Sequence, residues 1–305
     1  MIVSVLVLCV MATGLLIKSI DTLQKEQIET KAYFFSFFCL LIYCFAFASV
    51  YFYWRNSPHV SINDQTIKIG NQVYSLNDIK GIALTGKVPF PYFVNFPMEG
   101  MALLLNNGSE RFLYDDMYSN LHQVKSMLEQ VIVNEQEYNS VFLDHKGRNG
   151  VRLELEETFK GIQLINFRGI LLWGAISFLA IKLFVSAQIP SVAGLIIIGL
   201  MAALFFVSFS WEMHYFGLSK DYLIVRNHNF IWKSIVYGLS EIKEVVFETD
   251  RNRPNCMRVI TKDFRNKLYP AGTLRDKTWH RLKSRLEAKG VTVRNECIAE
   301  TVIDK

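Results

Sequence analysis

Long apolar runs constrain this chain more than any other feature. Residues 33–53 are uncharged and, at about 1.5 Å per residue, long enough to cross the ~30 Å hydrocarbon core of a bilayer. Residues 1–17 are interpreted as a second, shorter span, with a cleaved signal as the alternative. Residues 169–187 and 191–211 add two more, joined by a tight turn. The chain is therefore predicted to be an integral membrane protein with four transmembrane helices in two hairpins.

One charged residue, Lys182, lies well inside these runs. Burying a charged side chain in hydrocarbon costs free energy. Such a side chain therefore either has a function, for example in an ion pathway, or extends to the membrane interface. We expect Lys182 to extend to the outer head groups, because it is about 12 Å along a helix from Pro190. Tyr51–Trp54 and Trp211 end two of the runs, as suits the preference of Trp and Tyr for the interface.

Basic residues predict the orientation of the chain. Five lie between residues 146 and 168, and Lys220 and Arg226 follow the fourth run, whereas the turn between the third and fourth runs has no charge. Basic residues collect on the cytoplasmic side, so both polar regions and both termini are expected there. Three lysines between residues 18 and 32 weaken this rule for the first pair of runs.

The two polar regions repeat each other. Residues 74–82 (YSLNDIKGI) match residues 237–245 (YGLSEIKEV), and residues 61–69 match residues 217–225. In each copy, two short apolar segments flank a polar turn, which indicates a strand pair. An amphipathic helix pattern follows the strand pair in both copies. The sequence therefore predicts one module twice, each copy preceded by two membrane helices.

The final helix of each module is expected to cover its sheet. The helix at residues 117–132 should bury Leu121, Val124 and Leu128. The helix at residues 275–289 should bury Trp279, Leu282 and Leu286 and end at Gly290, a typical C′ residue. We expect residues 58–133 to superpose on residues 214–293. The predicted divisions are 1–54 (first hairpin), 55–133 (first module), 134–168 (linker with a strand pair at 138–155 and an interfacial elbow at 156–168), 169–211 (second hairpin) and 212–305 (second module).

This order of elements, with its Tyr-x-Leu-x-Asp/Glu-Ile-x-x-Ile/Val strand entry, resembles bacterial membrane-anchored proteins with pleckstrin-homology-like (PH-like) domains. The resemblance covers both modules and the runs before them. It implies a bent β-sandwich or open barrel capped by a C-terminal helix in each module, and a place in the bacterial cytoplasmic (inner) membrane. Eukaryotic relatives bind phosphoinositides through a Lys-x(n)-Lys/Arg-x-Arg pattern. That pattern is missing near Lys68 and between Lys220 and Lys233, so the resemblance does not imply inositide binding.

Sequence motifs for catalysis, nucleotides or metals are missing. The six histidines and five cysteines show no HxH, HExxH or CxxC spacing, and no GxxxxGK[ST], GxGxxG or GxSxG motif occurs. Asp78 and Glu241 occupy matching positions in the two copies, where a turn or capping role at the start of a strand explains them better than catalysis. We therefore expect a protein that is not an enzyme and holds no cofactor or metal.

Basic charge is concentrated near the C-terminus. Residues 251–294 hold thirteen Lys and Arg against three Asp and Glu, whereas residues 55–133 hold six against seven. An anionic membrane surface attracts each nearby Lys or Arg by ~1 kcal/mol. A solvated face, or cover by Glu154, Glu156 and Glu157, is the rival explanation, and sparse aromatic residues disfavour nucleic acid. The candidate lipid- or partner-binding residues are Lys262, Arg265, Lys267, Arg275, Lys277, Arg281, Lys283 and Arg285.

These patterns favour a non-enzymatic binding or scaffold protein of the membrane. Its modules would contact anionic lipid, a membrane-protein partner or a second copy of the chain. The alternative is a transporter subunit, or an envelope-stress-related membrane enzyme with an unrecognised site. We predict that a fragment of residues 214–305 binds anionic liposomes more tightly than one of residues 55–133, through Arg281, Lys283 and Arg285.

Overall fold

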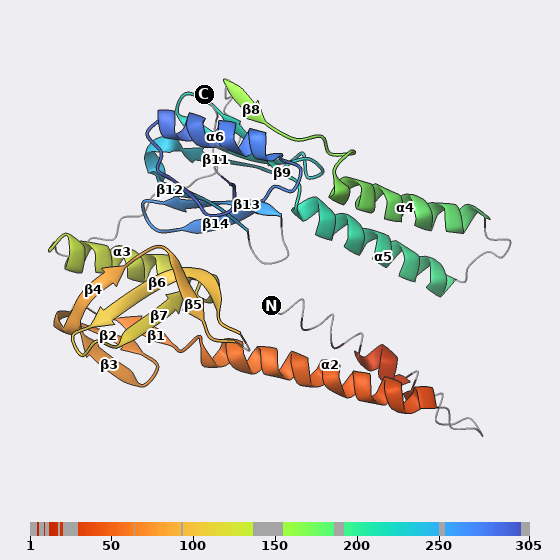
Figure 1. Ribbon diagram of the computed structural model, residues 1–305, viewed down its shortest axis with the longest axis horizontal. Helices are drawn as coiled ribbons and strands as arrows, with labels where there is room; N and C mark the ends of the chain where they lie inside the picture. Colours follow the sequence, from red (N-terminus) through yellow and green to blue (C-terminus); the bar gives the residue numbers. More distant parts are fainter. Residues whose placement is uncertain are drawn as a thin grey trace. The chain divides into compact units, whose positions relative to one another are not determined.

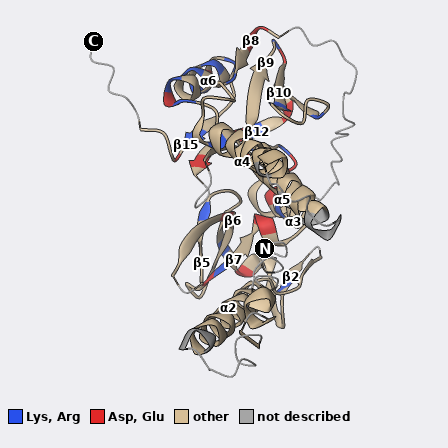
Figure 2. Ribbon diagram, turned by 90° about the vertical axis from the view of Figure 1, so that its right-hand side faces the viewer, with Lys and Arg blue, Asp and Glu red and all other residues tan. Residues whose placement is uncertain are grey.

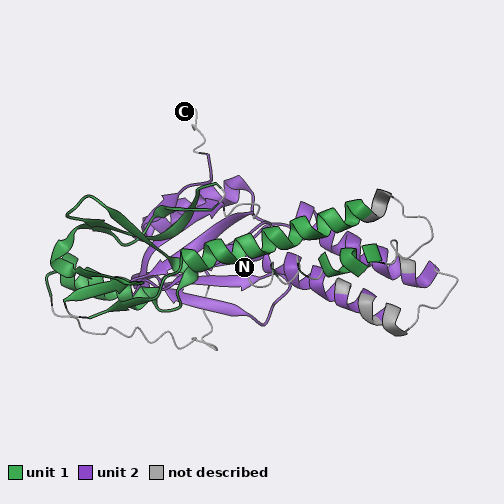
Figure 3. Cartoon of the chain, turned by 90° about the horizontal axis from the view of Figure 1, so that it is seen from below, with its two compact units in different colours: residues 1–139 green, residues 140–305 purple. Residues whose placement is uncertain are grey.

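The chain folds into two compact units, residues 1–139 and residues 140–305 (Figure 3). Each unit combines helices with mainly antiparallel sheets, as Figure 1 shows for this computed structural model. The mixed helix-and-sheet class predicted from the sequence is therefore confirmed. The residues that the structure describes are 5, 9, 12–17, 19–20, 30–63, 65–92, 94–136, 155–185, 192–249 and 254–299.

Unit 1 has a long apolar helix followed by two small sheets. The helix is α2 (Thr30–Arg55), and the sheet order is β1-β2-β3 in one sheet. In the other sheet, the long strand β6 pairs with β4, β5 and β7. The strands are β1 (Val60–Ile62), β2 (Thr66–Ile69), β3 (Gln72–Ser75), β4 (Ile79–Ala83), β5 (Lys87–Phe90), β6 (Phe96–Leu105) and β7 (Glu110–Tyr114).

Helix α3 (Leu121–Leu128) covers the sheets of unit 1. Leu121, Val124 and Leu128 are buried among core residues of β6 such as Met101, which confirms the predicted helix face. The helix begins four residues later than predicted, because residues Asp115–Met117 form a separate 3-10 turn, η2. Five further residues, Glu129–Val133, continue α3 as a π-helical turn.

Unit 2 packs two four-stranded sheets under a C-terminal helix, α6 (Asp276–Ala288) (Figure 1). Trp279, Leu282 and Leu286 are fully buried between α6 and the sheets, as predicted, and Gly290 has the positive φ of a C′ residue. One sheet has the order β11-β10-β9-β8, and the other has the order β14-β13-β12-β15. The strands are β8 (Glu157–Phe159), β9 (His214–Leu218), β10 (Tyr222–Asn227), β11 (Ser234–Gly238), β12 (Ile242–Thr249), β13 (Asn255–Thr261), β14 (Asn266–Pro270) and β15 (Val293–Asn295).

A helical hairpin is inserted between two neighbouring strands of unit 2. Helices α4 (Phe167–Val185) and α5 (Val192–Trp211) lie side by side (Figure 1). The chain enters the hairpin from β8 and leaves it into β9, and these strands pair directly, with Phe159 opposite Phe216. The sheet of the second module therefore includes β8, which the predicted start at residue 212 leaves out, and residues 157–159 of the predicted elbow at residues 156–168 form a strand. The β8 strand has only three residues, too few to show a strand period.

Among the described residues, two helical stretches are long and apolar enough to cross a membrane, by length and composition: Tyr33–Arg55 and Phe167–Val185. The part of α5 at Ile198–Trp211 is a shorter apolar helix. The predicted span at residues 1–17, the strand pair at residues 138–155 and the turn at residues 188–190 lie wholly or largely outside the described residues, as does the side chain of Lys182.

The two units have the same order of elements around their matching sequences. A 3-10 turn, η1 (Leu76–Asp78) or η4 (Leu239–Glu241), leads into β4 or β12. The carbonyl of Asp78 accepts a hydrogen bond from Asn106 N, and the carbonyl of Glu241 accepts one from Lys262 N. The Glu241 side chain also accepts from Gly238 N, a capping contact. Superposition of the two units stays a prediction of the proposed repeat.

Candidate binding surface

The eight basic residues predicted as a site do not share one face of unit 2. Arg281, Lys283 and Arg285 lie on α6, where Figure 2 shows blue and red segments together. Arg275 and Lys277 flank the start of the same helix. Lys262 and Arg265 lie in the turn between β13 and β14, and Lys267 lies in β14 itself. The structure therefore divides the predicted site into regions with different surroundings.

Acidic residues of β8 and its approach neutralise the charges on α6. Glu157 lies 2.9 Å from Arg281 Nε through one carboxylate oxygen and 3.0 Å from Arg285 Nε through the other. The Nζ of Lys289 lies 2.7 Å from the Glu156 carboxylate. Glu156 and Glu157 therefore form ion pairs of the kind that the acidic-cover explanation expects, although Arg281 and Arg285 stay 56% and 60% exposed. Glu154 lies outside the described residues.

The turn between β13 and β14 also has its own counter-charge. Arg265 Nε lies 3.2 Å from Asp263, whose carboxylate also accepts a hydrogen bond from the Thr261 hydroxyl. Lys262 is exposed at the same turn. This region therefore carries less net charge than its sequence suggests.

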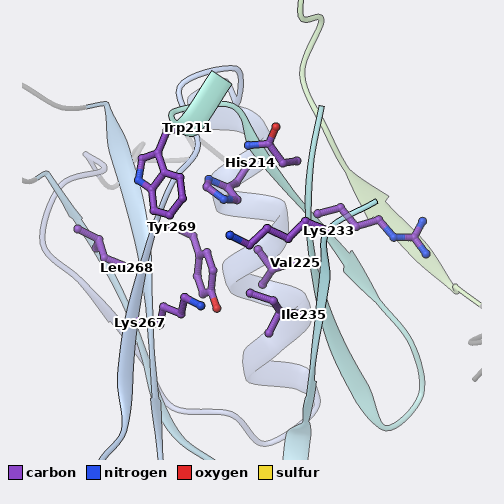
Figure 4. Close-up of a pocket in the computed structure, with 10 residues that line it drawn as sticks. Trp211, His214, Val225, Lys233, Ile235, Lys267, Leu268 and Tyr269 are labelled. Atoms are coloured by element: carbon purple, nitrogen blue, oxygen red, sulfur yellow. The ribbon is translucent and has the colours of Figure 1, made fainter. Parts of the chain in front are cut away.

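A pocket opens between β11 and β14, beside the C-terminal end of α5 (Figure 4). Lys233, just before β11, and Lys267 of β14 point into it from opposite sides toward Tyr269 (Figure 4). Trp211 and His214 line the end next to the helical hairpin. The pocket therefore combines two ammonium groups with three aromatic rings.

The two lysines lack an acidic partner within the described part of the chain, where neither forms an ion pair. The Nζ of Lys233 lies 5.1 Å from the centre of the Trp211 ring, and that of Lys267 lies 5.9 Å from the Tyr269 ring, distances typical of cation–π contacts. Partial burial lowers the pKa of Lys267, and the charge of Lys233 lowers it further. An anion placed between the lysines would relieve this repulsion.

Tyr269 and His214 form the rigid wall of the pocket. The hydroxyl groups of Tyr269 and Tyr237 hydrogen-bond across the gap between β14 and β11, and Tyr269 is 1% exposed. Burial lowers the pKa of His214 to about 4, so this ring is neutral near pH 7. The positive charge of the pocket therefore comes from its basic side chains, and the chemistry that this arrangement supports is anion binding.

Sequence reasoning found Lys267 but missed the pocket. The sequence patterns relate Lys233 only to the missing inositide motif and Trp211 only to the end of an apolar run. The sequence signal that could have indicated the pocket is position along the chain, because Lys233 directly precedes a strand and Trp211 directly ends a helix. The pairing of β9, β10 and β11 brings Trp211 and Lys233 together, and Lys267 comes from β14 of the other sheet.

Unit 1 uses its basic residues internally. Lys125 is buried 2.5 Å from Asp115, and Lys87 lies 3.7 Å from Glu99. Arg111 donates a hydrogen bond to the hydroxyl of Tyr74. These three basic side chains of unit 1 therefore have partners within their own unit.

Potential metal ligands are scattered over the part of the chain that the structure describes, where no group of three or more His, Cys, Asp or Glu side chains could hold an ion. The five cysteines are free thiols. Comparison of the sequence with protein-family models and with curated proteins finds no match.

Proposed function

We propose that this chain is an integral membrane protein whose second module binds anionic head groups at the membrane surface. The observation that carries this proposal is the pair Lys233 and Lys267 on opposite sides of one pocket next to Trp211. An ammonium group is a strong donor to a phosphate oxygen. The two lysines therefore suit a net anionic head group better than a zwitterionic one.

The position of the pocket supports a lipid ligand. Trp211 is the last residue of the apolar helix α5, and a terminal Trp marks the interface level of a membrane helix. Lys233 lies over the ring of Trp211, so both lysines would lie close to the phosphate level. At that level, the surface potential attracts each cation by ~1 kcal/mol.

The architecture of unit 2 supports a PH-like interpretation. Two four-stranded sheets are covered by a C-terminal helix, which is the sandwich that the resemblance implies. Unit 1 has the matching 3-10 turn, strand pair and final helix. We accordingly propose a tandem PH-like protein with four membrane spans and cytoplasmic modules, which acts as a membrane binding or scaffold protein.

The matched test compares two double variants of the full-length protein in detergent. Native mass spectrometry would count bound phosphatidylglycerol and phosphatidylcholine. Lys233→Gln/Lys267→Gln should weaken phosphatidylglycerol binding by about 10-fold or more, since a hydrogen bond to a charged group is worth about 1.5–3 kcal/mol. Arg281→Gln/Arg285→Gln removes the same charge from residues already paired with Glu157, so it should change binding little.

Two outcomes would contradict the pocket as the lipid site. Equal losses in both variants would show that total charge alone attracts the lipid. An unchanged phosphatidylglycerol count in Lys233→Gln/Lys267→Gln would leave a protein partner as the ligand of this module. Circular dichroism of each variant would check that its fold is intact.

A further inference from the structure

We propose that each unit inserts an apolar hairpin tip into the bilayer interface beside its own membrane helix. In unit 2 this tip is the β10–β11 loop at Phe230–Trp232, and in unit 1 it is the β5–β6 loop, with Tyr92 and Val94 as its described apolar residues. The partner is the boundary between the head groups and acyl chains of phospholipids. This inference rests on the proposed membrane location and adds a second contact, independent of the lysine pocket.

Large apolar side chains are exposed at the tip of unit 2. Ile231 is 79% exposed and Trp232 is 77% exposed. Burial of large apolar side chains is strongly favourable, so their exposure to water would forgo a large stabilisation. Trp also has a specific preference for the membrane interface.

The tip lies along the outside of α5. The ring of Phe230 packs edge-on against Phe206, with the ring centres 6.0 Å apart. Phe206 lies five residues before Trp211, or about 7.5 Å further along the helix. When α5 spans a membrane with Trp211 at the interface, Phe230 therefore lies below the head-group level.

Hydrogen bonds hold this loop in place. The Asn227 carboxamide oxygen accepts from Asn229 N and Phe230 N, while its amide donates to the carbonyl of Ser210 at 2.7 Å. The Asn229 amide donates to the Ser210 hydroxyl at 2.6 Å. The loop is thus fixed to the last turn of α5, so its insertion would need little further ordering.

A second apolar segment lies in the same region of unit 2. Ile162, Leu164 and Ile165 are mostly exposed just before α4 begins. Gln163, within this segment, donates a hydrogen bond to Asn229 of the β10–β11 loop. The β10–β11 loop and the connection from β8 to α4 therefore both present apolar side chains, as an interfacial rim requires.

Unit 1 has a corresponding arrangement with different strands. The hydroxyl of Tyr92 lies 2.6 Å from the Ser49 hydroxyl of α2, and its ring lies 5.1 Å from the Phe52 ring. Ser49 lies six residues before Arg55, or about 9 Å deeper along the helix. Val94, two residues after Tyr92, is 77% exposed. The tip therefore reaches along the apolar side of α2.

Spin labels at single cysteines in the full-length, cysteine-free protein would measure the depth of each tip. The protein would be reconstituted in vesicles of phosphatidylglycerol and phosphatidylcholine. Labels at Ile231→Cys and Val94→Cys test the tips. Leu204→Cys, exposed on α5, is the control within the proposed span, and Lys262→Cys is the control in water. Because the test and control sites are exposed, the labels should not disturb the core.

We expect labels at residues 231 and 94 to collide readily with oxygen and poorly with a water-soluble nickel chelate, at depths between those of the two controls. The label at residue 204 could be protected from the nickel chelate while the labels at residues 231 and 94 are as accessible to it as the label at residue 262. In that case tip insertion is wrong and the membrane location stands. If residue 204 is also water-accessible, the membrane location and the tip insertion both fail.

Discussion

At the scale of single residues, His214 connects the pocket to the stability of unit 2. Its Nδ1 lies 3.0 Å from the carbonyl oxygen of Pro270, and its ring is packed against those of Trp211 and Tyr269. Burial is the main cause that lowers its pKa, to about 4, with Lys233 and Lys267 lowering it further. The hydrogen bond to Pro270 opposes this shift without cancelling it.

This shift predicts that unit 2 loses stability in acid. The unfolded state binds a proton on His214 below pH ~6.5, whereas the folded state resists protonation down to about pH 4. The free energy of unfolding should therefore fall as the pH is lowered through this window, by roughly 3 kcal/mol in total. Burial also lowers the pKa of His228, so this residue contributes in the same direction.

Denaturant unfolding of the full-length protein in detergent, between pH 7 and pH 4.5, would measure this loss. His214→Gln keeps a neutral polar side chain and should flatten the dependence on pH. A His280→Gln variant on α6 serves as the control. An unchanged slope in His214→Gln would show that other groups dominate acid unfolding.

At the scale of elements, β8 is an integral part of unit 2. Phe159 is fully buried in its core, and Glu157 pairs with two arginines of α6. A fragment of residues 214–305 lacks this strand, so both arginines would lose their carboxylate partner. Liposome binding by that fragment would therefore measure charges that Glu157 pairs in the folded protein.

A better soluble module keeps β8 and omits the helical hairpin. Asn166 and Glu212 both hydrogen-bond to Gly272, so the ends of the hairpin lie close together. We predict that replacing residues 167–211 with a short Gly-Ser turn gives a soluble, folded module of residues 155–299. Removing residues 155–160 as well should lower its stability by about 3–5 kcal/mol, the usual effect of losing a buried Phe.

Circular dichroism during thermal unfolding would compare the two proteins. Phe159→Ala in the longer protein separates the loss of the core side chain from the loss of strand pairing. Equal melting temperatures with and without β8 would contradict the assigned role of this strand.

The elements that the sequence predicts well are those whose apolar residues recur with a clear helical period. Leu121, Val124 and Leu128 recur at helical spacing, as do Trp279, Leu282 and Leu286, so periodicity alone identifies the buried face of each final helix. By contrast, β8 is too short to show a period, and its partner β9 follows only after two helices.

The pocket could not be predicted for a related reason. Trp211, Lys233 and Lys267 come from three separate segments, and their proximity depends on sheet register and on the packing of the two sheets. The basic stretch was visible in composition, but composition does not show which charges have partners. Glu157 neutralises Arg281 and Arg285 from more than a hundred residues away in the sequence.

At the scale of the whole molecule, the proposed topology places both modules on one side of the membrane. Single cysteines at Ser109, in the β6–β7 turn, and at Lys262, in the β13–β14 turn, probe the two modules in a cysteine-free background. Both should react with a membrane-impermeant maleimide only after the cells are permeabilised, because the basic flanks of α4 and α5 favour the cytoplasm.

Labelling of either site in intact cells would overturn the topology. A periplasmic protein in the same cells serves as the control for reagent access, and a cytoplasmic protein as the control for leakage. Labelling at one site alone would show that the modules face opposite sides. The proposed topology excludes this result, because an even number of spans precedes each module.

The place of β8 has a consequence for biosynthesis. The ribosome makes this strand before the helical hairpin, but its partner β9 emerges only after both helices. With the hairpin in a membrane, β8 must wait on the cytoplasmic face until the second helix returns the nascent chain to that face. A hairpin that stalls after one crossing would strand β9 and α6 on the far side, and the domain would stay unfolded and open to proteases. With the hairpin in a membrane, unit 2 can therefore fold only after both helices of the hairpin have inserted.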